Sequence, residues 1–276
     1  MASTGDFSAV RCVGGALSYI FGNFRDFLIL ATPPVIGLAI IESLLQLAVP
    51  TGPMEPGTMD PAAMPQAGGA ALLAVIAMGI LNLVFYVMFA VAWHRKYLLP
   101  QETMTVAKAL RWRREKTRFL MLLILLGLIG FGIAMLGSFA MPALMMLGGA
   151  MGSAIIPIGT VLIALAVLVV FARLSLVFPA ASIGMGDFGI GDAWRASKGK
   201  ALGMFLILLL PAIIAVLASL PVLLIALVFG STGLMQTLTG YAVIALIGQA
   251  LNYFAIALAV SSLSAAFCDL TGYSPA

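Results

Sequence analysis

Residues 111–147 read RWRREKTRFLMLLILLGLIGFGIAMLGSFAMPALMML, a basic start followed by a long run without any charged residue. A helix needs about 20 apolar residues to cross a bilayer, and the run from 119 to 147 exceeds that length. Lys and Arg residues beside a span stay on the cytoplasmic side of the membrane. This stretch therefore predicts a transmembrane helix that enters the membrane from the cytoplasm.

Five more apolar runs have the length of a span, so we expect the chain to cross the membrane six times. The six runs cover residues 28–49, 69–93, 119–147, 154–180, 201–229 and 240–268. The sequence is 63% hydrophobic and only 9% charged, whereas soluble domains carry about 25% charged residues. We predict an all-α integral membrane protein in which residues 1–276 form a single transmembrane domain.

The 14 Lys and Arg residues lie in alternate polar gaps between these runs. They occur before the first run, between the second and third, and around the gap between the fourth and fifth. The gaps near 50–68, 148–153 and 230–239 hold none. This distribution predicts a multi-pass protein of the bacterial inner (cytoplasmic) membrane with both termini in the cytoplasm. The net charge of +4 then reflects topology and attraction to anionic lipids, and no nucleic acid partner is expected.

Three cytoplasmic stretches mix aromatic, aliphatic and basic side chains immediately before the first, third and fifth spans. They cover residues 6–25, 103–113 and 187–195. Such a stretch is typical of a short amphipathic helix that lies in the headgroup plane. The recurring order of interfacial helix, span, turn and span predicts a threefold repeat of hairpin units. Similar basic flanks would also give this pattern without a repeat.

Proline and glycine residues within the spans predict local irregularities and close helix packing. Kinks or breaks are expected at Pro33, Pro34, Pro142, Pro157, Pro211 and Pro221. Glycines in the third span are expected to let a neighbouring backbone approach, at Gly127, Gly130 and Gly137.

The basic residues beside the third and fifth spans, with one Arg near the end of the fourth, are candidate ligands for lipid headgroups. They are Arg111, Arg113, Arg114, Lys116, Arg173, Arg195, Lys198 and Lys200. Each one near the surface contributes about 1 kcal/mol of attraction to an anionic leaflet. For Arg173, three alternatives are open: a lipid phosphate, an ion pair with Asp187 or Asp192, and a purely structural anchor.

Polar side chains inside the spans form a second group of candidates. They are Glu42, Gln46, Asn82, Gln249 and Asn252. A carboxylate within a span is costly to bury, so Glu42 could carry a proton or bind a cation. The group could also line a path for a small solute. Interhelical hydrogen bonds, worth about 0.6 kcal/mol each, are the simpler alternative.

The sequence carries no recognisable catalytic or metal-binding pattern. It has no phosphate-binding glycine loop followed by Lys-Ser or Lys-Thr and no His-Glu-x-x-His, and its ten acids are scattered singly. His94 has no second His or Cys nearby, and Cys12 and Cys268 are expected to be reduced packing residues. We therefore expect no cofactor, no metal site and no enzymatic activity.

Two short motifs resemble a known group of membrane proteins. The motifs are ARLSLVFPA at 172–180 and DAWRASKG at 192–199. They are similar to sequences of bacterial six-span proteins related to the membrane domain of glycerophosphodiester phosphodiesterases, including the YciC-like group. In that group an Arg and a Pro close the fourth span, and a Trp-Arg segment opens the fifth. The resemblance implies an accessory membrane module concerned with envelope lipids or a partner protein, and it does not imply phosphodiesterase activity.

Three functional hypotheses follow from these features. The leading one is a non-enzymatic inner-membrane module that binds lipid headgroups or a partner protein, in envelope lipid homeostasis. The alternative is a small-solute transporter or exporter that uses the mid-membrane polar path and moves the proline-containing fifth span. A subunit of a larger assembly, or a homo-oligomer, is the third.

Overall fold

The computed structural model describes residues 7–48, 69–148 and 152–275, and no strand occurs within these ranges. Six helices in them are long and apolar enough to cross a membrane. The prediction of an all-α protein with six membrane-spanning helices is therefore confirmed. The predicted loop at 50–68 falls outside the described residues.

The six long helices begin and end close to the predicted spans. Their bounds are Phe24–Ala48 (α2), Gly69–Leu98 (α3), Arg114–Gly148 (α5), Gly152–Leu174 (α6), Ala201–Ser231 (α9) and Leu238–Thr271 (α10). Some helices extend beyond the apolar runs into the basic flanks. Arg95 and Lys96 lie in the last turn of α3, and Glu115 lies in the first turn of α5. These charges stabilise the two helix ends because they oppose the sign of the helix dipole there.

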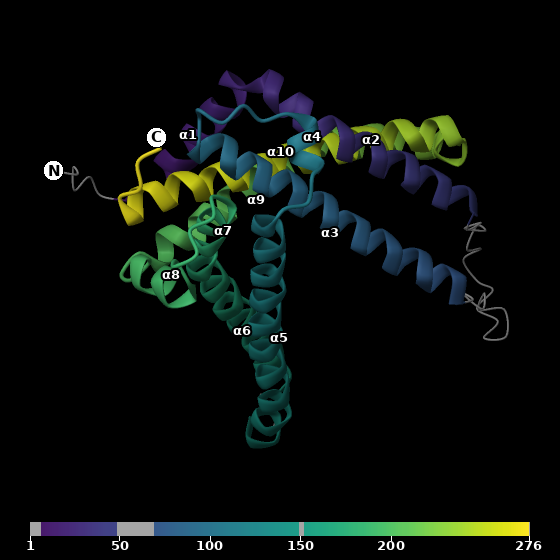
Figure 1. Cartoon of the computed structure of the whole chain (residues 1–276). Coiled ribbons are helices and arrows are strands. Elements are labelled where there is room, and N and C mark those ends of the chain that lie inside the picture. Colours follow the sequence, from purple (N-terminus) through teal and green to yellow (C-terminus); the bar gives the residue numbers. More distant parts are fainter. Residues whose placement is uncertain (1–6, 49–68, 149–151, 276) are drawn as a thin grey trace.

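Short helices precede α2, α5 and α9, where the sequence predicts them. They are Ala9–Gly22 (α1), Val106–Leu110 (α4) and Ile190–Ala196 (α8). The described chain also contains the short helix Val177–Ser182 (α7) and the 3-10 turn Leu234–Gln236 (η2). Together with the Lys- and Arg-bearing ends of the long helices, α1, α4, α7 and α8 form what we call the basic end of the molecule (Figure 1). The opposite ends of the long helices are the far ends.

A turn divides the fourth predicted span into α6 and α7. Ser175 and Leu176 leave the helix between them. In a continuous helix, the ring of Pro179 would collide with the carbonyl group of Ser175, four residues earlier. The break therefore lies one turn ahead of the proline. The prolines named above all lie inside continuous helices, so the expected breaks do not occur at those positions.

Large aromatic side chains at the basic end hold α1, α2, α3 and α10 together. The rings of Phe27, Phe89, Trp93 and Tyr253 form a chain of contacts with centroids 5.1 to 6.3 Å apart. Tyr19 of α1 packs edge-on against Trp93, and its hydroxyl group donates to the carbonyl of Lys96 at 2.9 Å. Aromatic pairs of this kind contribute about 0.5–1.5 kcal/mol each beyond the burial of their area.

Two buried hydrogen bonds join α3 to α10 beside this aromatic cluster. The indole Nε1 of Trp93 donates to Ser261 Oγ at 2.7 Å, and His94 Nδ1 lies 2.7 Å from Ser264 Oγ. The Ser264 hydroxyl group donates to Val260 O, so it accepts from His94 Nδ1. The small serine side chains let the backbone of α10 come close to α3. His94 is thus a packing residue of the core.

Glycines bring α5 and α6 together as a pair. A Cβ atom on Gly137 would overlap the side chain of Ile163, and one on Gly130 would lie 3.3 Å from Val167. At these two positions side chains of α6, rather than its backbone, approach the glycine, whereas a Cβ on Gly127 would meet nothing within 4 Å. Away from the basic end, the α5–α6 pair runs in a different direction from α2, α3 and α10 (Figure 1).

The far halves of α3, α5 and α9 consequently have few neighbours. None of the residues in the apolar 18-residue stretch of α9 is buried, and only 11% of the residues in the corresponding stretches of α3 and α5 are buried. Exposed Leu, Ile, Val and Phe side chains cover these surfaces. In a bilayer, lipid tails rather than protein would surround them. The core that positions polar side chains is therefore concentrated at the basic end.

Candidate functional site

All cations of the chain lie at the basic end, and their contacts sort them into three groups. The side chains of four pair with carboxylates: Arg11, Arg95, Lys96 and Arg195. The side chains of four others donate hydrogen bonds to main-chain carbonyl groups: Lys108, Lys116, Arg118 and Arg173. Within the described residues, the remaining six make neither kind of contact: Arg25, Arg111, Arg113, Arg114, Lys198 and Lys200.

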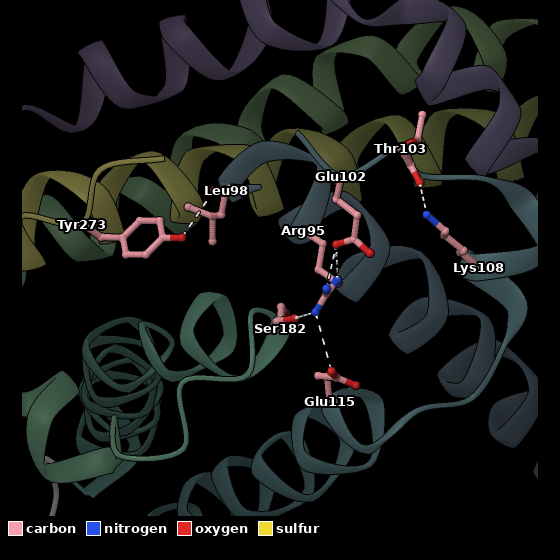
Figure 2. Close-up of polar contacts among 8 residues, drawn as sticks. All are labelled: Arg95, Leu98, Glu102, Thr103, Lys108, Glu115, Ser182 and Tyr273. Atoms are coloured by element: carbon pink, nitrogen blue, oxygen red, sulfur yellow. Dashed lines mark hydrogen bonds and ion pairs between the residues drawn. The ribbon is translucent and has the colours of Figure 1, made fainter. Parts of the chain in front are cut away.

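Arg95 is the centre of the most connected polar cluster (Figure 2). Its Nε and Nη2 atoms both donate to Glu102 Oε2, at 2.9 and 2.6 Å. Its Nη1 atom donates to the carbonyl of Ser182 at 3.0 Å and lies 3.7 Å from Glu115 Oε1. One guanidinium group thereby joins the end of α3 to the following loop, to the start of α5 and to the end of α7.

A small pocket, partly open to solvent, adjoins this cluster. It is lined by Val91, Ala92, Arg95, Glu102, Met104, Lys108, Arg113, Glu115 and Lys116. Arg95 already pairs with both carboxylates, so the unmatched charge of the pocket is positive. Lys108 Nζ donates one hydrogen bond, to Thr103 O at 2.8 Å, which leaves two of its protons without a partner in the described residues. The guanidinium donors of Arg113, an exposed residue, are all unused there. Such a pocket suits an anion such as a phosphate group.

Lys116 differs from the headgroup ligand that we expected. Its side chain is only 3% exposed, and its ammonium group donates to the carbonyls of Ala109 and Arg111. It therefore closes the turn between α4 and α5. The sequence places it among exposed cations, and nothing in the spacing of the charges distinguishes it from them.

Arg173 is also engaged within the protein. Its guanidinium carbon lies 3.4 Å above the ring centroid of Trp194. Its Nε donates to Ser197 Oγ at 3.1 Å and its Nη2 to the carbonyl of Trp194 at 2.8 Å. Of our three alternatives, these contacts correspond to the structural anchor, which fastens α8 to the end of α6.

Asp192 does not pair with Arg173 but completes the start of α8. Its carboxylate accepts from the backbone N–H of Gly189 at 2.8 Å and from Arg195 Nη2 at 2.5 Å. These two hydrogen bonds hold the pKa of Asp192 below its usual range, because both stabilise the ionised carboxylate. Arg195 therefore reaches the surface as part of an ion pair, whereas Lys198 and Lys200 make no such contact within the described residues.

Arg118 is a structural residue that sequence reasoning missed. Its guanidinium group donates to the carbonyls of Met185, Gly186 and Phe188, at 2.6, 2.7 and 3.1 Å. It thus holds the loop before α8 against α5. A basic residue at the start of an apolar run signals membrane topology, and the sequence gives no indication that this one binds a loop 67 residues away.

Exposed aromatic residues accompany the free cations. Trp112 is 41% exposed between Arg111 and Arg113, and Trp194 is 43% exposed six residues before Lys200. Tryptophan side chains of this kind favour the headgroup level of a bilayer, where one edge meets water and the other meets acyl chains. The arrangement matches the expected combination of cations and aromatic residues at a membrane surface.

The candidate polar path is brought together only in part. Gln249 Nε2 of α10 donates to Glu42 Oε1 of α2 at 2.6 Å. Asn82 Nδ2 donates to Met78 O of its own helix at 3.0 Å, and the side chain of Asn252 is exposed on α10. The side chain of Gln46 lies outside the described part of the chain. Within the described residues, these side chains do not form a continuous polar path.

The cysteines and acids offer no evident ligand set. Among the described residues, no group of three or more His, Cys, Asp and Glu side chains could hold a metal ion. The Cys12 thiol lies 3.7 Å from Asp269 Oδ2, and burial together with that carboxylate raises the pKa of Cys12 to about 12. The thiol is therefore protonated at neutral pH and behaves as a packing residue.

Comparison with protein-family models, with curated proteins and with solved structures found no match to the chain. The relation to the YciC-like group therefore stays a prediction from the two motifs.

Proposed function

We propose that the protein is a non-enzymatic, multi-pass module of the bacterial inner membrane whose basic end faces the cytoplasm and binds anionic phospholipid. The phosphate of the headgroup would lie in the pocket beside Arg95, where Lys108 and Arg113 offer donors without partners in the described residues. This unmatched positive charge in a pocket is the observation that carries the proposal.

The surroundings of the pocket support the same function. Trp112 and Leu110 are exposed beside it and have the amphipathic character that favours the boundary between headgroups and acyl chains. Arg111 and Arg114 add positive charge next to it, and Lys198 and Lys200 extend the charge along the basic end. The family resemblance implies the same kind of accessory module for envelope lipids.

The proposal is tested by native mass spectrometry of the protein released from nanodiscs that contain phosphatidylglycerol and phosphatidylethanolamine. The double variant Lys108→Gln/Arg113→Gln removes two pocket cations. At about 1 kcal/mol for each cation, we expect roughly 30-fold weaker retention of phosphatidylglycerol. The matched control Arg11→Gln/Arg195→Gln removes the same charge from two ion-paired positions and should retain the lipid.

Two results would contradict the pocket as the binding site. One is equal loss of lipid from both double variants, which would indicate a diffuse charge effect. The other is unchanged retention in the pocket variant. Arg173 is unsuitable as a probe because its removal would also release α8.

Small-solute transport is the second candidate, and the hydrogen bond between Glu42 and Gln249 is the observation that favours it. The positions of Asn82 and Asn252 weaken it, because neither joins that pair. Uptake or efflux that depends on Glu42 but not on Lys108 and Arg113 would favour transport over lipid binding.

A further inference from the structure

The contact between Glu42 and Gln249 leaves one polar atom without a partner. Gln249 Nε2 donates to Glu42 Oε1 at 2.6 Å. The other atom of the same amide group, Gln249 Oε1, is buried and accepts no hydrogen bond from the described residues. A buried acceptor without a donor is rare, because its loss of hydration is not compensated. Among the described residues, the site therefore lacks one hydrogen-bond donor.

Turning the amide group over does not supply that donor. Gln249 Oε1 would then face Glu42 Oε1, and two acceptors at 2.6 Å require a proton between them. In either orientation of the amide, a single additional proton completes the hydrogen bonding. The carboxyl group of Glu42 already contacts this amide and can carry that proton.

The charges around Glu42 also favour a neutral carboxyl group. Every Lys and Arg of the chain lies at the basic end, and no ion pair to Glu42 occurs among the described residues. Glu42 is roughly 27 Å along α2 from Phe24, at 1.5 Å per residue. An ionised carboxylate without a cation is unfavourable in such surroundings, and it becomes neutral by binding a proton.

The charged side chains on the helices packed against α2 lie away from Glu42. On α10, Tyr241 lies close enough for its charge to interact with that of Glu42, and it shares the helix face of Gln249. The charged residues of α3, Arg95 and Lys96, lie at the basic end, and its far half carries the neutral Asn82. The titratable residues of α1 and α4, the other helices that contact α2, also lie at the basic end.

We propose that Glu42 and Gln249 form a proton-binding site. The protonated carboxyl group donates from its hydroxyl oxygen to Gln249 Oε1, while its carbonyl oxygen accepts from Gln249 Nε2. The two hydrogen bonds close a ring between α2 and α10. Loss of the proton removes the donor to Gln249 Oε1 and leaves a single hydrogen bond. This site is separate from the headgroup pocket and does not depend on lipid binding there.

Dicyclohexylcarbodiimide tests whether Glu42 carries a proton, because it modifies protonated carboxyl groups in apolar surroundings. The carboxyl oxygen adds to the central carbon of the carbodiimide while the acid proton moves to a nitrogen. The resulting O-acylisourea rearranges to a stable N-acylurea. With the full chain in liposomes, we expect peptide mass spectrometry to find this adduct on Glu42 at neutral pH and less of it as the pH rises. Glu102, ion-paired with Arg95, is the internal control and should stay unmodified.

Infrared difference spectroscopy gives a second measurement that does not require the reagent to reach the site. The spectrum of the wild-type protein minus that of Glu42→Gln should contain the C=O stretching band of a protonated carboxyl group. In Gln249→Leu that band should persist at higher frequency, because the carbonyl oxygen no longer accepts a hydrogen bond.

The proposal is overturned if neither the adduct nor the infrared band depends on Glu42 at neutral pH. A band that keeps its frequency in Gln249→Leu would overturn the pairing with Gln249. An adduct on Glu42 together with a shifted band in Gln249→Leu would support both parts. Glu42→Gln keeps the size of the side chain and its ability to pair with an amide, so a folded control protein is expected.

Discussion

Trp93 and His94 are adjacent in α3, and both donate to serines of α10 from fully enclosed positions. A polar group in a buried site needs its partner, because water cannot replace it there. The two serines thus determine how α3 and α10 align at the basic end. Ser262, the neighbour of Ser261, instead donates to Leu258 O of its own helix. Neighbouring serines in one buried segment therefore serve different purposes.

Ser261→Ala should destabilise the protein because it leaves the indole N–H of Trp93 without an acceptor. We expect a loss of about 1–2 kcal/mol in the free energy of unfolding, within the range for buried hydrogen bonds and near the upper limit measured in membranes. Ser262→Ala is the matched control and should change stability little. Thermal unfolding in detergent, followed by tryptophan fluorescence, measures both. Equal stability of the two variants would argue against this role of Ser261.

The roles of single cations could not be predicted from the sequence. Arg111, Arg113 and Lys116 lie in one short segment and look equivalent there, yet Lys116 is buried and the two arginines are exposed. The difference arises because Lys116 lies on the face of α5 that turns toward the carbonyls of the preceding turn. The sequence did identify the region of the candidate site, because the membrane confines Lys and Arg to one side.

At the scale of elements, the short helices of the basic end depend on contacts made by the long ones. An isolated helix needs about 12–15 residues to be even marginally stable in water, and α4, α7 and α8 are shorter. Arg118 donates to main-chain carbonyl groups of the loop before α8, and Arg173 donates to a main-chain carbonyl group of α8 itself. The composition of the sequence predicted α1, α4 and α8. It did not predict α7, because the separation of α7 from α6 depends on a proline inside an apolar run.

Gly137→Ala should disturb the packing of α5 against α6. The new methyl group would overlap Ile163, and forcing extra volume into a packed contact costs about 1–3 kcal/mol. Gly132→Ala, on the same helix, meets nothing within 4 Å and should leave stability unchanged or raise it by up to about 1 kcal/mol. The melting temperatures of Gly137→Ala and Gly132→Ala, measured in detergent, are compared with that of the wild-type protein. A melting temperature for Gly137→Ala at or above that of Gly132→Ala would contradict the contact.

At the scale of the whole molecule, six antiparallel crossings bring the start of α1 and the end of α10 to the same end. Arg11 of α1 pairs with Asp269 of α10 at 3.1 Å, and Tyr273 donates to the carbonyl of Leu98 (Figure 2). The number and placement of the spans were predictable because hydropathy dictates them. The direction of the α5–α6 pair was not, since apolar side chains that face lipid and those that face protein look alike in the sequence.

Reporter fusions test the side of the membrane on which the basic end lies. We expect alkaline phosphatase to be inactive at either terminus and active when inserted near residue 58. The start of α1 and the end of α10 lie at the basic end, whereas no Lys or Arg lies near residue 58. Green fluorescent protein at the C-terminus should fluoresce. Phosphatase activity at either terminus would contradict the proposed orientation.

The few neighbours of the far halves also govern how the protein can change over evolutionary time. Apart from the α5–α6 contact at Gly137 and the Glu42–Gln249 pair, a side chain there would meet mainly lipid tails, so exchange among Leu, Ile, Val and Met should leave no cavity and create no overlap. At the basic end, each exchange meets an aromatic ring, a serine or a carbonyl group with a fixed position. Random mutagenesis with selection for folded protein should therefore fill the far halves, outside these two contacts, with neutral substitutions and leave the basic end nearly invariant. Homologous chains should share little beyond hydropathy in the first region and individual residues in the second.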